Sequence, residues 1–300
     1  MKNINKFFLV LVILLFTISV IGCSAGGKVD DASKGNGTSD SDNSGQENAG
    51  DQDTTDGDDS NDGDTSDEVG IIDKIKDNNK LIWGTNAAFA PFEMREGNEV
   101  IGIDAEIAQK IADKLGVELV VEDMEFDSLI AALQSGKIDF IAAGFTIKPD
   151  RQEKVLFTDT YFKAVQAVMI QDGNPDIKVY EDLEGKKIGV QIDTTGFYEA
   201  DDIKDAEVIQ FNNGIEAVLD LGNGNIDAVI IDNLPAQILV NSNPDLVILD
   251  FDDKPFEDEE YAMAVRKEDT ELQEVINEVL KELQDSGEIG ELVNKYSIGE

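Results

Sequence analysis

The chain has 300 residues, no histidine, a single cysteine and a formal net charge of −40. This acidity argues against nucleic acid as a partner, and the lack of histidine excludes histidine-containing metal sites and nucleophiles activated by histidine. One cysteine cannot form an internal disulfide, acid–base chemistry by aspartate and glutamate stays open, and the length is typical of about two domains.

Residues 1–22 have the composition of a signal peptide. Two lysines precede an apolar run over residues 7–20, which is shorter than the ~20 residues of a membrane-spanning helix and fits a signal h-region. The tetrapeptide VIGC ending at Cys23 resembles the lipobox of bacterial lipoproteins, which implies cleavage before Cys23 and its acylation, as by palmitate. Two acyl chains anchor a protein stably to a membrane. The alternative is a plain signal peptide or an uncut anchor with an incidental cysteine.

Residues 23–69 are expected to form a disordered acidic linker behind the lipidated Cys23. Residues 24–68 contain 14 acidic residues, two lysines and no aromatic residue. Such a segment buries too little apolar area to offset its ordering entropy, and its like charges extend it. A calcium loop beginning at Asp58 would need a glutamate where Val69 stands, so the segment is interpreted as a tether.

From residue 70 onward, short strands alternate with helices. Strands are predicted over residues 80–84, 117–121, 138–143 and 161–170, and helices after Gly102 and over residues 126–134. The helix after Gly102 has one apolar face and ends at Gly116. This alternation predicts a largely parallel sheet with helices on both faces.

A second set of elements follows Pro175. Strands are predicted over residues 187–191, 207–210, 226–231 and 246–249, and helices over residues 197–202, 215–221 and 234–241. One more strand at residues 261–265 precedes an amphipathic helix with apolar residues from Leu272 to Leu283, and residues 288–296 form the last element. The pattern indicates two α/β lobes rather than tandem repeats.

The segment from Gly144 to Arg151 follows the predicted strand 138–143 and could bind an anion. Gly144 lets a ligand approach the backbone, and Thr146 offers a hydroxyl beside it. Pro149 can begin a helix, so Arg151 can turn its guanidinium back toward the strand end, where its planar fork of donors suits a carboxylate. The alternative is an ordinary strand–turn–helix with a surface arginine.

Several motifs then recur in a fixed order. They are GTNAAFAPFE at residues 84–93, GID at 102–104, FDSLIAALQSG at 126–136, AGFTI at 143–147 with Arg151, GVQ at 189–191, TTG at 194–196, and IDAV at 226–229 with Asp232. Together they resemble the amino-acid-binding proteins of ABC importers, bacterial extracellular solute-binding protein family 3, which include glutamine-, histidine- and lysine/arginine/ornithine-binding proteins. The resemblance covers about residues 78–296.

This resemblance implies an α/β, two-lobed fold of the periplasmic-binding-protein type II kind. Residues 70–165 plus 262–300 would form the first lobe and residues 166–261 the second. Two hinge strands near residues 163–170 and 257–265 would join the lobes, and closure would bury the ligand in the cleft between them.

The resemblance also implies how a ligand's α-amino and α-carboxylate groups are held. Arg151 would grip the carboxylate in a bidentate pair, and Asp232, at the end of a strand of the second lobe, would pair with the ammonium. Four further residues would help through hydroxyl or backbone groups: Gly144, Thr146, Thr194 and Thr195. Taken alone, Asp232 could instead cap a helix, and the threonines could be turn residues.

Four residues would contact the ligand's side chain. Phe89 and Phe126 would cover it with apolar walls, although each could be a core aromatic, and Asn86 and Gln191 would read its polar groups. The family often has an acid where Asn86 stands, so a neutral Asn86 weakens the case for a cationic side chain. Two further departures lie nearby: Asp193 stands where glycine is common, and Lys148 where a small polar residue is common.

The expected function is an extracytoplasmic receptor that captures a polar amino acid and delivers it to the permease of an ABC importer. It would be a monomer, lipid-anchored on the outer face of the bacterial cell membrane, without cofactor, metal or catalytic residue. The alternative is a cyclohexadienyl or arogenate dehydratase-like enzyme on the same fold, with Glu93 or Asp104 as candidate acids. A receptor sensor domain would be expected to continue into a spanning helix and an output domain.

Overall fold

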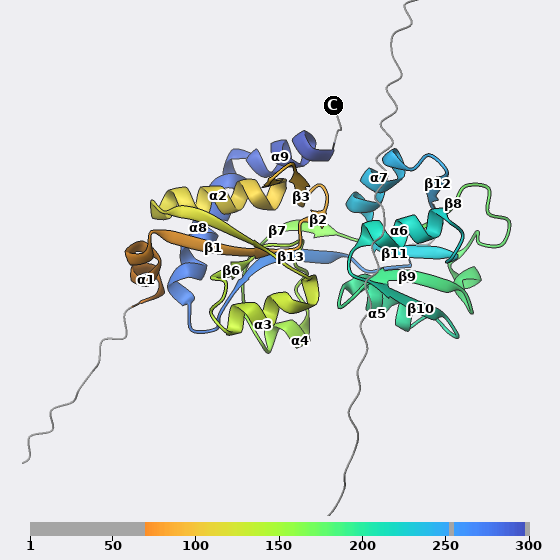
Figure 1. The fold of residues 1–300 in the computed structure, drawn as a ribbon, viewed down its shortest axis with the longest axis horizontal. Helices are drawn as coiled ribbons and strands as arrows, with labels where there is room; N and C mark the ends of the chain where they lie inside the picture. Colours follow the sequence, from red (N-terminus) through yellow and green to blue (C-terminus); the bar gives the residue numbers. More distant parts are fainter. Residues whose placement is uncertain (1–69, 252–254, 298–300) are drawn as a thin grey trace, which may run out of the picture. The chain divides into compact units, whose positions relative to one another are not determined.

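The computed structural model describes residues 70–251 and 255–297. The predicted signal peptide, Cys23 and the acidic linker lie outside the described residues. Within the described part, strands form two five-stranded sheets and one three-stranded sheet (Figure 1). We call the two larger sheets, each with its covering helices, the first and the second lobe.

The sheet of the first lobe is mixed rather than largely parallel. Its strand order is β5-β1-β6-β13-β7. β1 pairs in parallel with β5 and β6, whereas β13 runs antiparallel to β6 and β7. The bounds are β1 Lys80–Thr85, β5 Glu118–Asp123, β6 Phe140–Ile141, β7 Leu156–Ala164 and β13 Glu259–Val265. The prediction of a largely parallel sheet was wrong at β13, because this strand enters from the second lobe and so runs opposite to β1.

Helices cover both faces of this sheet, as the alternating pattern predicted (Figure 1). One apolar cluster joins one face to α1 Ile71–Asn78, α2 Ile103–Leu115, α8 Thr270–Ser286 and α9 Glu288–Ser297. A second cluster joins the other face to η1 Phe126–Ser128 and α3 Leu129–Gln134. Successive residues of β13 alternate between the clusters, as the pleat of a strand requires: Met263 packs in the first and Ala264 in the second. The short helix α4 Pro149–Gln152 follows β6.

A three-stranded antiparallel sheet lies between β1 and α2, where the sequence pattern predicted neither strand nor helix. It consists of β2 Ala88–Phe89, β3 Glu93–Glu96 and β4 Glu99–Ile101. These strands are too short for a periodicity of two to be visible in the sequence. The small sheet places Phe89 and Glu93 on neighbouring strands, where they are paired in register.

The second lobe also contains a mixed five-stranded sheet, but its strands follow the chain in a different order. Its strand order is β10-β9-β11-β8-β12, in which β9 pairs in parallel with β10 and β11, and β8 runs antiparallel to β11 and β12. The strands are β8 Gln166–Gln171, β9 Lys187–Gln191, β10 Glu207–Phe211, β11 Ala228–Asp232 and β12 Leu246–Ile248. The helices are η2 Tyr180–Leu183, α5 Thr195–Asp201, α6 Gly214–Gly222 and α7 Asn233–Ser242. The strand predicted over residues 187–191 matches β9 residue for residue.

The chain passes between the lobes at two adjacent places. The single strand predicted over residues 161–170 is in fact two strands, since β7 ends at Ala164 and β8 begins at Gln166 in the other sheet. At the return crossing, Glu259 of β13 pairs with Ala164. No glycine or proline marks this one-residue break, which explains why the strand pattern missed it, although it lies within the hinge region 163–170 that the resemblance implied.

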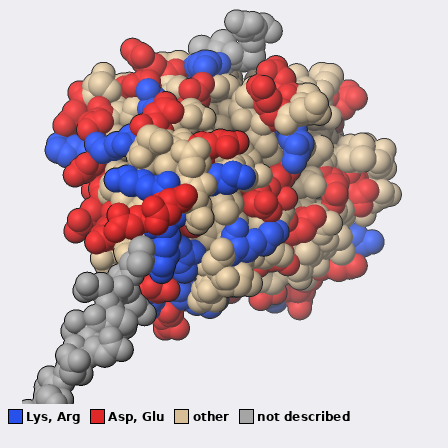
Figure 2. Space-filling view, turned by 60° about the vertical axis from the view of Figure 1, so that its left-hand side comes forward, with Lys and Arg blue, Asp and Glu red and all other residues tan. Residues whose placement is uncertain are grey.

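The outer surface carries both signs of charge. Figure 2 shows acidic and basic side chains interspersed on one face, with acidic groups more abundant. Several basic residues are paired with acids of other helices, as in Lys110–Glu288 at 2.8 Å and Lys114–Glu278 at 3.1 Å. Within the described residues, no helix combines the length and apolar character needed to cross a bilayer.

Candidate functional site

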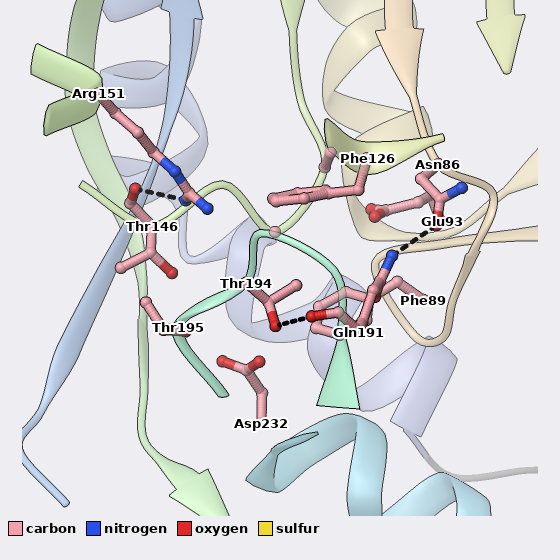
Figure 3. Close-up of a pocket in the computed structure, with 12 residues that line it drawn as sticks. Asn86, Phe89, Glu93, Phe126, Thr146, Arg151, Gln191, Thr194, Thr195 and Asp232 are labelled. Carbon is pink, nitrogen blue, oxygen red and sulfur yellow. Dashed lines mark hydrogen bonds between the residues drawn. The ribbon is translucent and has the colours of Figure 1, made fainter. Parts of the chain in front are cut away.

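A small pocket is lined by residues of both lobes (Figure 3). All ten residues that the sequence assigned to a ligand line it, together with two that were not assigned. The complete lining is Asn86, Phe89, Glu93, Phe126, Ala143, Gly144, Thr146, Arg151, Gln191, Thr194, Thr195 and Asp232.

The pocket lies where strands of both sheets end. Asn86 follows β1, Gly144 follows β6, and Gln191 and Asp232 are the last residues of β9 and β11. Parallel strands direct their carboxyl ends to the same edge of a sheet, which is where open α/β sheets bind ligands. α4 begins at Pro149 and turns Arg151 back to this edge.

Arg151 is buried, with 2% of its surface exposed, and carries the positive charge of the pocket. Its Nη1 donates to the carbonyl oxygen of Thr146 at 3.0 Å, and its Nη2 donates to the carbonyl oxygen of Asp193, in the second lobe, at 2.7 Å. The guanidinium carbon lies 4.5 Å from the centre of the Phe145 ring. Burial lowers the pKa of Arg151. No carboxylate of the described residues forms an ion pair with it, so its charge is free to bind an anion.

Asp193 and Lys148, the two departures from the family pattern, do not line the pocket, and both side chains contact Tyr198 beside it. Asp193 adopts a φ of +60°, which aspartate tolerates. Its carboxylate accepts a hydrogen bond from the hydroxyl of Tyr198 at 3.1 Å. The Lys148 Nζ lies 3.1 Å from the centre of the same Tyr198 ring, and burial lowers the pKa of Lys148. Lys148 of the first lobe thus contacts the second lobe beside the pocket.

Asp232 carries a negative charge into the pocket from the second lobe. Its side chain does not cap α7. It accepts a hydrogen bond from the Tyr261 hydroxyl of the first lobe at 2.5 Å. Burial and the negative charge of Glu259 raise the pKa of Asp232 to about 7, against hydrogen bonds from Tyr261 and Gln166 that lower it. A cation at this position would favour the ionised form.

The two threonines before and at the start of α5 are held by side-chain hydrogen bonds. Thr194 Oγ1 donates to the carbonyl oxygen of Gln191 at 2.8 Å, and Thr195 Oγ1 accepts from Gln166 Nε2 at 3.0 Å. Gln166 Nε2 also donates to Glu259 at 3.0 Å, and Thr146 Oγ1 donates to the same carboxylate at 2.8 Å. Glu259 therefore ties the start of β13 to both lobes.

The opposite side of the pocket is lined by Asn86, Glu93 and Phe89, away from Arg151 (Figure 3). Asn86 Oδ1 accepts a hydrogen bond from Gln191 Nε2 at 3.0 Å, which joins the two lobes. Phe89 packs against the apolar cores of both lobes. Phe126 is 9% exposed and tilts against Phe145, with ring centres 5.7 Å apart. Phe126 is therefore a core residue that also lines the pocket, whereas Phe89 is partly buried between the pocket and the two cores.

Glu93 is the charged one of the two pocket residues that the ligand assignment missed. Its side chain is 1% exposed, and neither carboxylate oxygen accepts a hydrogen bond from a donor in the described part of the chain. Burial raises the pKa of Glu93 well above its usual range, and the neighbouring charge of Asp104 adds to the effect. The sequence did carry a signal for it, because Glu93 directly follows the apolar Phe-Ala-Pro-Phe run. A carboxylate in such a position is costly to bury without a partner.

Comparison with known proteins identifies the family. The sequence profile of the bacterial extracellular solute-binding proteins, family 3, matches residues 81–300. The chain belongs to this family. The resemblance read from the motifs is therefore confirmed, and so is the predicted two-lobed fold of the periplasmic-binding type II kind.

Relatives of family 3 cover most of the chain. The arginine-binding extracellular protein ArtP of Bacillus subtilis is 35% identical over 224 residues, which are 74% of this chain and 87% of ArtP. A crystal structure of the P235GK mutant of ArgBP from T. maritima has 42% identity and a TM-score of 0.71, over 75% of this chain and 98% of that one. The ancestral amino acid-binding protein AncCDT-1, a precursor of cyclohexadienyl dehydratase, has 32% identity and a TM-score of 0.70, over 76% of this chain and 99% of that one.

Proposed function

We propose that this protein is an extracytoplasmic receptor of an ABC importer that captures an amino acid with a cationic side chain, of the arginine type. The observation that carries the proposal is the order of charges in the pocket. Arg151 and Asp232 lie apart from Glu93, which is buried among aromatic rings on the other side (Figure 3). An amino acid with a basic side chain presents the complementary order of charges.

Each end of such a ligand would meet a group of opposite charge. The α-carboxylate would pair with the Arg151 guanidinium, and the α-ammonium with Asp232. The side-chain cation would lie against Phe89 and Phe126, whose ring faces attract cations, and would pair with Glu93. A buried carboxylate without donors is stabilised strongly by a charged partner. The neutral Asn86, where the family often has an acid, weakened the case for a cationic side chain, but Glu93 would supply the negative charge in its place.

The names of the relatives support the same ligand class. ArtP of Bacillus subtilis and ArgBP of T. maritima are both named for arginine. Their identities to this chain exceed one third over nearly three quarters of its length.

A thermal-shift screen of the twenty amino acids plus ornithine and citrulline tests the proposal. L-arginine should raise the melting temperature most, because a ligand at 100 times its Kd stabilises the native state by about 2.7 kcal/mol. Glutamate, which would place a carboxylate against Glu93, should have the smallest effect among long side chains. A screen in which no amino acid shifts the transition would contradict the proposed function.

Two observations support the enzymatic alternative: the pair of buried acids Glu93 and Asp104, and the likeness to AncCDT-1, a precursor of cyclohexadienyl dehydratase. Incubation with prephenate or arogenate discriminates between the two functions. We expect no product, because the charges of the pocket are explained by binding an amino acid and do not require a reaction. Accumulation of phenylpyruvate or phenylalanine would favour the enzyme.

We infer further that the mature chain is a monomer tethered outside the cytoplasm by acylated Cys23. The support is the sequence alone: an apolar signal segment that leads into the one cysteine of the chain, followed by an acidic linker. Two acyl chains suffice for stable anchoring, and the linker would hold the lobes away from the membrane.

A further inference from the structure

Glu93 and Asp104 are held beside each other by the backbone. The amides of Ile103 and Asp104, at the start of α2, donate to the carbonyl oxygens of Pro91 and Phe92 at 3.0 and 2.9 Å. Gly102 makes this approach possible: its φ is +134°, and a Cβ there would lie 2.2 Å from the Phe92 oxygen. The start of α2 therefore places Asp104 beside Glu93, the first residue of β3.

The two members of this pair have different surroundings. Asp104 is 0% exposed and fully engaged: it accepts hydrogen bonds from the Gly144 amide at 3.0 Å and from the Tyr161 hydroxyl at 2.7 and 2.9 Å. Glu93 lines the pocket, and its carboxylate accepts no hydrogen bond from a donor of the described residues. Asp104 is thus the inner member, and Glu93 is the member that a ligand reaches.

The charges facing Glu93 from the neighbouring elements are negative or paired. Asp104 faces it from α2, Tyr161 from β7 and Asp123 from β5. Asp123 is paired with Arg95 of β3 at 2.6 Å, so it adds little. Two carboxylates that share a buried site do not both ionise without a cation. When protonated, Glu93 donates a hydrogen bond to Asp104.

We propose that Glu93 and Asp104 form a one-proton selector for the ligand's side chain. With the proton in place, the pocket presents a neutral hydrogen-bonding group and accepts an uncharged amide or ureido side chain. Without it, the pocket presents a negative charge and accepts a cation, so that binding of a cationic amino acid expels one proton. The inference rests on the proposed function and adds a pH-dependent choice between two ligand classes.

The direction of the pH effect follows from linkage. Burial raises the pKa of Glu93 well above its usual range and that of Asp104 to about 6. A bound cation lowers the pKa of the pair, so the complex holds fewer protons than the free protein, and its affinity rises with pH until the free pair is ionised. The limiting slope is about tenfold in Kd for each pH unit. A neutral side chain does not change the proton count at the pair.

Calorimetry with L-arginine and L-citrulline isolates this effect, because citrulline has nearly the shape of arginine without its charge. Asp232, whose pKa is about 7, titrates in the same range. It faces the α-ammonium that both ligands share, so it cancels from the ratio of their affinities. Measurements from pH 5.5 to 8.5 in two buffers of different ionisation enthalpy give both this ratio and the number of protons released.

For the wild-type chain, the preference for arginine over citrulline should rise at least tenfold across this pH range. Arginine should also release up to one more proton than citrulline. Glu93→Gln should bind citrulline with little change, lose most of the preference for arginine and make the ratio independent of pH. Glu96→Gln, the same change at an exposed position of the same strand, should behave as wild type.

Asp104→Asn tests the role of the Asp104 charge while keeping the hydrogen bonds that support the fold. Asparagine can still accept from Gly144 and Tyr161, but it removes the charge that holds the proton on Glu93. The preference for arginine should therefore persist to a pH at least one unit lower than in wild type. A ratio that is flat with pH in wild type, or unmoved by Asp104→Asn, overturns the selector and leaves the proposed function intact. Failure of both ligands to bind at every pH contradicts the proposed function itself, and the selector with it.

Discussion

Arg151 and Asp232 bring opposite charges into one pocket from two different lobes. Arg151 is held by carbonyl oxygens of both lobes, at 3.0 and 2.7 Å, and Asp232 by a tyrosine of the first lobe. Neither is paired with the other or with another charged residue of the described part. Such groups are expensive to bury without a partner, and a bound amino acid supplies both partners at once.

Arg151→Ala should nearly abolish binding of the amino acid identified by the screen. Removing one partner of a buried pair costs about 3–5 kcal/mol, which corresponds to roughly two to four decades in Kd. Arg151→Lys should recover only part of the affinity, because an ammonium cannot reproduce the bidentate fork. Calorimetry measures the effect. Binding of Arg151→Ala within about threefold of wild type would show that this arginine does not hold the carboxylate.

At the scale of elements, α4 of the first lobe meets the turn before α5 of the second. Arg151 donates to the Asp193 carbonyl, and Lys148 lies over the Tyr198 ring at 3.1 Å. On the other side of the pocket, Gln191 bonds to Asn86. These contacts link the lobes around the pocket through residues of both, so the same side chains line the site and hold the lobes together.

The junction between β3 and α2 depends on Gly102. Gly102→Ala should destabilise the protein by about 1–3 kcal/mol, since alanine is strained at a φ of +134° and its Cβ would meet a backbone oxygen. For domains of this size, each kcal/mol lowers the melting temperature by about 2–4 °C. Gly290→Ala in α9 is the control, because a Cβ there meets nothing within 4 Å. Equal melting temperatures for the two variants would argue against a structural role of Gly102.

For the whole molecule, an acidic surface fits the proposed receptor that works outside the cytoplasm. The described lobes carry mixed charges with acids in excess on the face in Figure 2, which suits solubility and disfavours phosphate-rich partners. Surface pairs such as Lys110–Glu288 contribute little stability, about 0–1 kcal/mol each. The apolar clusters of the two sheets are therefore the main source of stability.

Cys23→Ala should release the protein from the membrane or block its processing, because the acyl chains would have no attachment site. Cell fractionation together with mass spectrometry of the mature N-terminus measures this outcome. Serine at the position after it, Ser24→Ala, serves as a control that should leave anchoring unchanged. An acylated, membrane-bound Cys23→Ala protein would refute the anchor proposal.

The sequence by itself determined many of the local elements and the set of residues that line the pocket. Apolar periodicity located α2 and β9, glycines marked helix ends, and the ordered motifs named ten residues that all line one cavity. Such signals are readable because they act over a few neighbouring residues, or because a whole set of motifs occurs in order. The break at Val165 between β7 and β8 was not readable from the strand pattern, since no glycine or proline marks it, although it lies within the hinge region 163–170 that the resemblance implied.

Only the tertiary structure decided which of these residues act on one another. The contact of Asp104 with Gly144 and Tyr161, the support of Arg151 by the Asp193 carbonyl and the bond from Tyr261 to Asp232 join segments far apart in the chain. Whether Glu93 is an exposed loop acid or a buried, unpaired carboxylate depends on how closely α2 approaches β3. That distance is set by packing and by burial, which govern charge and protonation but leave no periodic trace in the sequence.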